Sequence, residues 1–285
     1  MVSETILPGT LYIVATPIGN LADFSLRGIA VLQGVALIAA EDTRHSRPLL
    51  RHFCVHTPVL ALHEHNEREV TAKLLTRLQA GDPVALISDA GTPLVSDPGF
   101  HLVGGARSAG IRVVPIPGPS AAVCALSAAG LPSDRFVFEG FLPAKQAARC
   151  QRLEALVRET RTLIIYESSH RIVAALSDMA KILGKGRAAV VARELTKRFE
   201  TIRDGTLGAL ARWVADDPDQ QRGEFVVLIR GAEAADDETG LEEERVLKIL
   251  LEELSAKQAA LIAARITGGR RNRLYALAQT LKPKV

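Results

Sequence analysis

The sequence of 285 residues has few cysteines, few aromatic residues and no long apolar segment. Cys54, Cys124 and Cys150 lack the spacing of a metal site or a disulfide framework, which predicts reduced thiols. No apolar run is long enough to span a bilayer, and the N-terminus lacks the basic region and long apolar core of a signal peptide. We therefore expect a cytoplasmic protein that contacts no membrane.

The net charge is also small, at +3, so the total charge neither indicates nor excludes a nucleic-acid partner. Aromatic residues make up only 4% of the chain, and any stacking function therefore rests on single side chains. A hydrophobic content of 47% and a charged content of 24% are typical of a globular protein. The length is sufficient for two domains.

The most informative stretch begins with the apolar run Val84–Ile87, which predicts a buried strand. It is followed by a turn-rich segment in which Asp89 and Asp97 alternate with glycine and proline. Ligands bind beyond the carboxyl ends of strands in an open α/β sheet. The Asp-Pro-Gly segment alone is more typical of an ordinary turn, but two such turns in tandem favour a binding site.

Four other segments of the first half also predict strands. Leu11–Ala15 and Val35–Ala40 come first, Val59–Leu62 precedes the central stretch, and Ile111–Ile116 follows it. Strands that alternate with helices predict a parallel sheet with right-handed crossovers. The break at Pro117-Gly118-Pro119-Ser120 predicts a domain boundary.

Two polar clusters follow these strands. Glu41-Asp42-Thr43-Arg44-His45 places ionisable groups directly after a buried strand, which is costly unless they are solvated, paired or functional. A surface ion pair between Asp42 and Arg44 is the alternative interpretation. His63-Glu64-His65-Asn66-Glu67 lacks the histidine spacing of a zinc protease, so we expect no metal; it would cap the following helix or touch a polar substrate.

The second half predicts a mixed sheet, because its strands are separated by intervals of both hairpin and helix length. The strands are expected at Phe136–Phe141, Thr162–Ser168, Ala188–Ala192 and Glu224–Ile229. A basic segment, Lys145 to Arg152, follows the first of them.

The C-terminal part resembles a helix-turn-helix. Helices are expected at Leu241–Leu254, from the Ser255 cap to Ile266, and at Arg271–Leu281, after an acidic linker. From Arg245 onward there are nine Lys or Arg residues but only two acidic ones, which indicates a nucleic-acid contact hidden by the near-neutral total. A solvated appendage or a dimerisation arm is the alternative.

Several motifs together resemble the tetrapyrrole methylase family, and within it the branch of small-subunit ribosomal RNA 2′-O-ribose methyltransferases. The motifs are Thr16-Pro17-Ile18-Gly19-Asn20-Leu21, Ala40-Glu41-Asp42-Thr43-Arg44, Ser88-Asp89-Ala90-Gly91-Thr92-Pro93 with Asp97-Pro98-Gly99, Pro117-Gly118-Pro119-Ser120, Tyr166-Glu167-Ser168 and Arg193-Glu194-Leu195-Thr196-Lys197. Porphyrin-type members carry a Gly-rich N-terminal loop, which is replaced here by the stiffer Thr16-Pro17-Ile18-Gly19.

The resemblance implies two α/β domains, at residues 1–117 and 118–232, with S-adenosylmethionine in the cleft between them. A linker at 233–240 and an RNA-binding helix-turn-helix domain at 241–285 would follow. The resemblance further implies a homodimer that methylates a cytidine ribose in the decoding region of 16S rRNA, in the small ribosomal subunit.

The candidate site residues fall into three groups, of which the cofactor-binding group is implied by the family motifs. The cofactor would be bound by Pro17, Ile18, Asp89, Gly91, Thr92, Ser120, Ala121, Tyr166, Ala192 and Glu224. The catalytic candidates are Glu41, Asp42, Arg44, His45, Glu194 and Lys197. The candidates for RNA binding are Lys145, Arg149, Lys257, Arg270, Arg271 and Arg273.

Methyl transfer to a ribose hydroxyl requires orientation of the reactants and help with removal of the hydroxyl proton. We expect the loops at Glu41 and Lys197 to bracket the ribose, with Asp42 or Glu41 as base or orienter, Lys197 as electrostatic partner and Arg44 as phosphate contact. Two alternatives stay open: a methyltransferase that acts on small tetrapyrrole-like molecules, and a non-catalytic RNA-binding protein.

Overall fold

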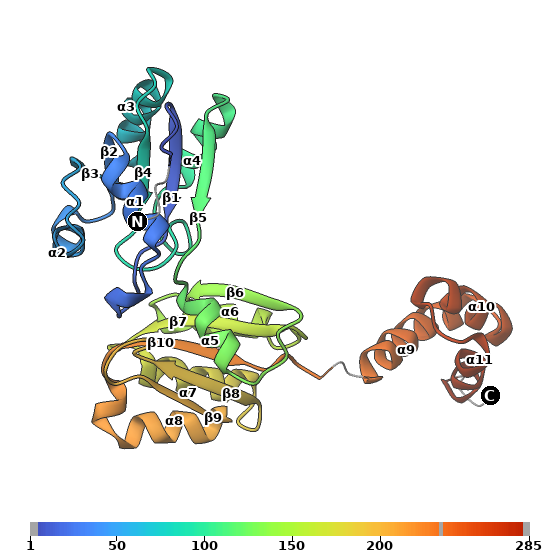
Figure 1. Cartoon of the computed structure of the whole chain (residues 1–285). Helices are drawn as coiled ribbons and strands as arrows, with labels where there is room; N and C mark the ends of the chain where they lie inside the picture. The colour runs from blue at the N-terminus through green and yellow to red at the C-terminus, as the bar shows by residue number, and fades with distance from the viewer. Residues whose placement is uncertain (1–4, 234–235, 282–285) are drawn as a thin grey trace. The chain divides into compact units, whose positions relative to one another are not determined.

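The computed structural model describes residues 5–233 and 236–281 (Figure 1). The chain forms two compact units, one ending at Gly231 and the other beginning at Ala232. The first unit contains two five-stranded sheets, each in a lobe of its own. In the described part of the chain, no helix has both the length and the apolar character needed to cross a membrane.

The N-terminal lobe is built on a sheet in the order β3-β2-β4-β1-β5, in which every strand pair is parallel. Its strands are β1 (Thr10–Val14), β2 (Leu37–Ala40), β3 (Val59–Ala61), β4 (Val84–Ile87) and β5 (Arg112–Ile116). Its helices are α1 (Leu26–Gly34), α2 (Thr43–His52), α3 (Glu67–Gln79) and α4 (Phe100–Ser108), with a 3-10 turn, η1 (Leu21–Asp23). The predicted parallel sheet is confirmed.

Apolar clusters cover both faces of this sheet, as is usual for parallel strands. The central strand β4 lies between β1 and β2. Because the strands are parallel, the loops after β1, β2 and β4 all emerge at one edge. These loops begin at Ala15, Glu41 and Ser88, and they carry the polar motifs singled out in the sequence.

Two acidic residues fix helix starts near this edge. Asp42 is the N-cap of α2, and its carboxylate accepts the Arg44 N–H at 2.8 Å. Glu67 is buried, and its Oε1 accepts the N–H groups of Gly99 and His101 at 3.0 and 2.8 Å. Thus Glu67 stabilises the first turn of α4.

The C-terminal lobe holds a mixed sheet in the order β6-β7-β10-β8-β9, as predicted; β6 pairs parallel to β7 and the other pairs are antiparallel. Its strands are β6 (Phe136–Phe141), β7 (Thr162–Ser168), β8 (Ala188–Arg193), β9 (Thr201–Thr206) and β10 (Glu224–Ile229). Its helices are α5 (Ala121–Ala128), α6 (Gln146–Ala155), α7 (Ile172–Leu183) and α8 (Leu207–Asp216), with a 3-10 turn, η2 (Pro218–Gln221). The predicted lobe boundary at residue 117 falls between β5 and α5.

One face of this sheet packs against α6, α7 and α8 in the largest apolar cluster of the lobe. The other face packs against α5 and against Ile18 of the N-terminal lobe. Strand β9 was not predicted, because Thr-Ile-Arg-Asp-Gly-Thr has a single large apolar residue, Ile202. An edge strand with exposed side chains lacks the alternation that identifies a half-buried strand.

The C-terminal unit is a three-helix bundle of α9 (Asp236–Glu253), α10 (Ala256–Thr267) and α11 (Arg271–Leu281) around its own apolar core. Ser255 and Gln258 form a capping box at α10, and Gly268 ends that helix with φ 74°. The expected linker at 233–240 was wrong at its end, because α9 begins at Asp236. Acidic residues suit the first turn of a helix, which explains how the charged segment joins α9.

Arg149 corrects one prediction for RNA binding. Its side chain is only 5% exposed, and its guanidinium donates to Asp178 Oδ2 at 2.7 and 2.8 Å and to the Ala144 carbonyl at 3.2 Å. Arg149 was expected to contact RNA, but its guanidinium on α6 pairs with Asp178 of α7. Arg149 therefore links α6 to α7 and is not available to RNA.

Substitution R149A should lower the free energy of unfolding by about 3–5 kcal/mol, because it leaves Asp178 buried and unpaired. Urea unfolding of the full chain measures this change. The matched control is K73A, which breaks the exposed Lys73–Glu69 pair and should leave the free energy of unfolding nearly unchanged. Equal losses in the two variants would contradict a structural role for the buried pair.

Candidate functional site

A cavity of about 350 Å³ is lined by residues of both lobes. This volume lies in the range of sites for small molecules and cofactors. Its lining residues are Ile18, Glu41, Asp89, Ala90, Gly91, Thr92, Val95, Ser96, Asp97, Ser120, Ala121, Phe141, Tyr166, Glu167, Ser168, Leu195, Glu224, Phe225 and Val226. It will be called the large cavity.

The wall contributed by the N-terminal lobe depends on a backbone bridge between the loops after β1 and β4. Thr16 and Gly91 exchange two hydrogen bonds, of 2.9 and 3.0 Å. Gly91 has φ 85°, and a Cβ there would approach Ile18 Cγ2 at 3.4 Å. Farther along the same loop, Leu94 and Ser96 have φ values of 72° and 70°, which is strained backbone of the kind found at binding sites.

Five carboxylates line the large cavity. Those of Glu167 and Glu224 come from the C-terminal lobe and are paired with Arg171 and Lys197, whereas Glu41, Asp89 and Asp97 come from the N-terminal lobe. Burial, reinforced by the charges of Glu41 and Asp89, raises the pKa of Asp97 to about 7, although the Ser88 hydroxyl lowers it. Burial and the charge of Asp89 also raise the pKa of Glu41. Among the described residues that line this cavity, none is Lys or Arg. A positively charged ligand would offset this repulsion, so the donor set fits a sulfonium and an amino group.

Aromatic rings form the wall from the C-terminal lobe. The Tyr166 ring lies edge-on to Phe138 and Phe141, with centroids 4.9 and 5.7 Å apart. The Tyr166 hydroxyl accepts the Ala122 N–H at 3.0 Å, which ties β7 to the start of α5. Burial raises the pKa of Tyr166, so it stays a neutral phenol. The cavity thus has an acidic side and an apolar side, as an amphipathic nucleoside cofactor requires.

A second cavity is lined by Pro17, Ile18, Gly19, Leu21, His45, Ser46, Leu49, Asp89, Ala90, Lys197 and Glu224. It will be called the lysine cavity. Ile18, Asp89, Ala90 and Glu224 line both cavities, so the two adjoin.

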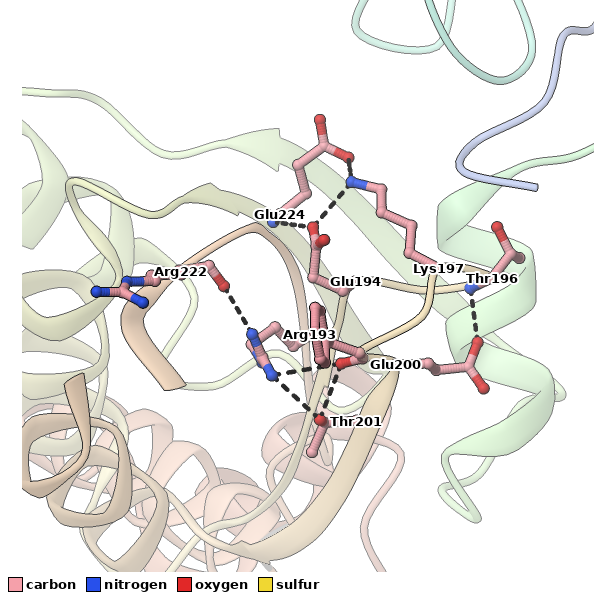
Figure 2. A network of polar contacts seen from close by, with 9 residues as sticks. Arg193, Glu194, Thr196, Lys197, Glu200, Thr201, Arg222 and Glu224 are labelled. Carbon is pink, nitrogen blue, oxygen red and sulfur yellow. Dashed lines mark hydrogen bonds and ion pairs between the residues drawn. The ribbon is translucent and has the colours of Figure 1, made fainter. Parts of the chain in front are cut away.

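Lys197 is held between two carboxylates, as Figure 2 shows. Its Nζ lies 2.8 Å from Glu194 Oε1 and 2.9 Å from Glu224 Oε2. Burial lowers the pKa of Lys197, but the hydrogen bonds to both carboxylates outweigh it and the net shift is upward. For Glu194, burial raises the pKa, whereas the hydrogen bond from Lys197 makes the net shift downward. Lys197 is therefore a fixed cation and not a base.

Two glycines make room for this arrangement. A Cβ on Gly19 would lie 2.4 Å from Lys197 Cγ, and one on Gly223 would lie 2.5 Å from the Glu194 carboxylate. Lys197 and the loop of Gly19 belong to different lobes, so the close approach at Gly19 brings the lobes together beside the lysine cavity.

Most of the predicted site residues gather around these cavities. Ile18, Asp89, Gly91, Thr92, Ser120, Ala121, Tyr166, Glu224 and Glu41 line the large cavity. Pro17, His45 and Lys197 line the lysine cavity, and Glu194 contacts Lys197.

Besides Glu194, three of the predicted cofactor-binding and catalytic residues line neither cavity: Ala192, Asp42 and Arg44. Ala192 is buried in the apolar cluster beneath Tyr166. Asp42 caps α2 and pairs with Arg44 at 2.8 Å; the Arg44 side chain is 85% exposed. Hydrogen bonds from Arg44 lower the pKa of Asp42. The surface ion pair that the sequence left open therefore exists.

Asp97 and Phe141 line the large cavity but were not among the predicted site residues. Asp97 lies within the stretch identified as a binding loop, and its Asp-Pro-Gly context is also typical of an ordinary turn. Phe141 gave no sequence signal apart from the scarcity of aromatic residues.

The candidates for RNA binding lie on exposed surface, apart from Arg149. Lys145 belongs to the first unit, and Lys257, Arg270 and Arg271 are exposed on the C-terminal unit. Arg273 is also exposed, and its Nη2 lies 3.1 Å from the buried Glu243 carboxylate. In the described residues, no group of three or more His, Cys, Asp or Glu side chains is arranged to hold a metal ion.

Comparison with known families gives two matches along the chain. The profile of the Tetrapyrrole (Corrin/Porphyrin) Methylases matches residues 10–211. The profile of the RsmI C-terminal HTH domain matches residues 237–282.

Curated relatives are similar over nearly the whole chain. A protein of Pseudomonas aeruginosa named ribosomal RNA small subunit methyltransferase I is 60% identical over 94% of this chain and 95% of its own length. A protein of the same name from Escherichia coli O157:H7 is 53% identical over 94% of this chain and 93% of its own length.

Solved structures share the fold of the first unit. Uroporphyrin-III-C-methyltransferase from Thermus thermophilus is 19% identical, with a TM-score of 0.56 over 78% of this chain and 94% of that one. Diphthine synthase is 15% identical, with a TM-score of 0.60 over 78% of this chain and 90% of that one. Another structure of the Thermus enzyme, complexed with S-adenyl homocysteine, has a TM-score of 0.54 at 16% identity, over 77% of this chain and 96% of that one.

The raised pKa of Asp97 predicts a pH-dependent stability. The folded state keeps this proton up to about pH 7, whereas the unfolded chain releases it near 3.8, the ordinary pKa of an aspartate. The contribution of Asp97 to the free energy of unfolding should therefore fall as the pH rises from about 4 to about 7. Relative to the wild type, D97N should gain melting temperature across this window.

Thermal unfolding at pH 4, 5.5, 7 and 8 measures this difference. The control D134N removes a carboxylate that is 76% exposed on the surface. A D97N difference that does not grow with pH would contradict the predicted linkage.

Proposed function

This chain belongs to the tetrapyrrole methylase family of S-adenosylmethionine-dependent methyltransferases, and we propose that it methylates the 2′-hydroxyl of a cytidine ribose in the decoding region of 16S rRNA. The observation that carries the proposal is the adjacency of the two cavities. One is acidic and fits a cationic cofactor, and the other holds a lysine fixed in its charged form. The name shared by the curated relatives supports rRNA of the small subunit as substrate.

S-adenosylmethionine supplies an electrophilic methyl group on a sulfonium. The residues of this chain that would hold it are Asp89, Asp97 and Glu41 on the acidic side, Gly91 and Ser120 at the loops, and Tyr166 on the apolar side. Asp89 is itself oriented, because its Oδ1 accepts the Asp42 N–H at 3.1 Å.

Lys197 would stabilise negative charge that develops on the ribose oxygen. A protonated ammonium fixed by two carboxylates requires no reorganisation when that charge appears, which is the basis of electrostatic catalysis. Glu194 and Glu224 fix its position. His45 lines the same cavity, where it would contact the substrate.

Glu41 is a better base than Asp42. Burial and the charge of Asp89 raise the pKa of Glu41 toward the working pH, which strengthens it as a proton acceptor. Asp42 is committed to Arg44 and to the N-terminus of α2, which lower its pKa. Arg44, with its exposed guanidinium, would contact an RNA phosphate at the edge of the site.

We further infer that the enzyme works as a cytoplasmic homodimer and that its C-terminal unit binds the RNA of the small ribosomal subunit. Exposed Lys257, Arg270 and Arg271 support the RNA contact, because phosphate backbones bind clustered cations. Lys145 would add a contact from the first unit.

The substrate is tested by transfer of a radiolabelled methyl group from S-adenosylmethionine. The acceptors are small ribosomal subunits that lack the modification, naked 16S rRNA and a porphyrinogen. We expect label in the RNA, located at a ribose by nuclease digestion and chromatography. Label only in the porphyrinogen would establish a small-molecule methyltransferase instead, and label in none of the acceptors would overturn the proposal.

K197A should lower kcat by about 10²–10³ while the Kd for S-adenosylmethionine changes by less than about threefold, because Lys197 acts on the acceptor oxygen. E41Q should lower kcat by about 10²–10⁴ through loss of the base. D42A should have the smaller effect, since it removes a helix cap. K73A, at an exposed pair, is the control. Full activity of both K197A and E41Q would discard these assignments.

A further inference from the structure

The segment between β8 and β9, Glu194–Glu200, is held in place by the buried Arg193 (Figure 2). The guanidinium of Arg193 donates to the Arg222 carbonyl at 3.0 Å, to the Phe199 carbonyl at 3.3 Å and to Thr201 Oγ1 at 3.4 Å. Arg193 therefore ties the far end of this segment back to its beginning. The segment will be called the lysine loop.

Bonds within the lysine loop fix it further. The Thr196 N–H donates to Glu200 Oε2 at 2.6 Å, and the Lys197 N–H donates to the Glu194 carbonyl at 3.0 Å. Glu194 and Thr196 have φ values of 51° and 65°, which side-chain-bearing residues adopt only where the surrounding contacts impose them. These hydrogen bonds and backbone angles define the conformation of the lysine loop.

Phe199 is exposed despite this fixed backbone. Phe199 is 64% exposed. Its carbonyl accepts hydrogen bonds from the Arg193 guanidinium at 3.3 Å and from the Thr201 hydroxyl at 3.2 Å. These bonds fix the backbone from which the ring projects. The guanidinium of Arg198 lies over the ring, 5.5 Å from its centroid. Arg198 covers one face, and a planar ring has a second face free to stack.

We propose that Phe199, backed by Arg198, stacks on an unpaired base of the RNA substrate next to the methylated nucleotide. The proposal rests on the proposed function. The Cα atoms of Phe199 and Lys197 are at most about 7.6 Å apart, because consecutive Cα atoms are 3.8 Å apart. Phe199 and Lys197 thus project from the same short loop, and a base on Phe199 would bind at the loop that carries Lys197. Unpaired RNA bases stack on exposed aromatic rings and on Arg guanidinium planes.

A second copy of this chain is the competing occupant of this ring. Glu200 follows Phe199 closely in the chain, and Glu is depleted in protein interfaces. The guanidinium of Arg198, which lies over the ring, instead complements a phosphate backbone. The surroundings of Phe199 thus favour RNA.

The test uses the full-length enzyme with small ribosomal subunits that lack the modification. F199A and F199L should raise the KM for subunits about ten- to hundredfold, because both remove the stacking face. F199W should stay within about threefold of the wild type. The Kd for S-adenosylmethionine, measured without RNA, should be unchanged in all three variants.

The matched control is F136A, which removes another exposed ring of the same lobe. Phe136 is 43% exposed and begins β6, whereas the residue of β6 that lines the large cavity is Phe141, at the other end of the strand. F136A should keep the KM for subunits of the wild type. Circular dichroism and light scattering check that every variant is folded and keeps the oligomeric state of the wild type.

Three results would overturn the proposal. One is an unchanged KM for F199A, and another is wild-type behaviour of F199L, which would show that an apolar contact suffices without stacking. The third is a change of oligomeric state in F199A, which would assign the ring to a contact between copies. Failure of the proposed function is distinct, because the wild type itself would then leave the subunits unlabelled.

Discussion

The two hydrogen bonds between Thr16 and Gly91 are the constraint on which the site depends. They join the loops after β1 and β4, two strands that are neighbours in the parallel sheet. The loop that carries Asp89 and Asp97 also has positive φ values at Leu94 and Ser96. The bridge holds Ile18 beside the apolar face of the second sheet. One backbone contact thus shapes a cavity wall and the junction of the lobes.

The chemistry follows from the separation of opposite charges into adjoining cavities. Burial and neighbouring carboxylates raise the pKa of Asp97 and of Glu41 in the large cavity, whereas Lys197 is neutralised by Glu194 and Glu224. In the proposed reaction, a positively charged methyl donor would be attracted to the large cavity. A ribose oxygen that gains negative charge would be stabilised beside Lys197 in the lysine cavity.

The architecture was predictable from the sequence because buried strands give continuous apolar runs, such as Val84–Ile87 and Leu163–Ile165. Strand β9 was missed because an exposed edge strand has no such run. Arg149 was misplaced because a basic residue on an amphipathic helix gives the same pattern whether it faces water or a buried Asp178. The choice between Glu41 and Asp42 required the structure as well. Adjacent carboxylates in one motif differ only in which one caps a helix and which one faces a cavity.

The position of Lys197 could not be predicted from the sequence of the lysine loop alone, because it depends on Gly19 and Gly223. Lys197 reaches its position only because Gly19, far away in the chain, has no Cβ where Lys197 Cγ passes. Gly223 likewise has no Cβ at the place that the Glu194 carboxylate occupies. Neither glycine belongs to a phosphate-binding pattern. Gly19 has no positive φ, so a left-handed turn does not explain its presence. Both glycines allow two chain segments to approach closely. Such an approach exists only in the folded chain, so the sequence of either segment does not predict it.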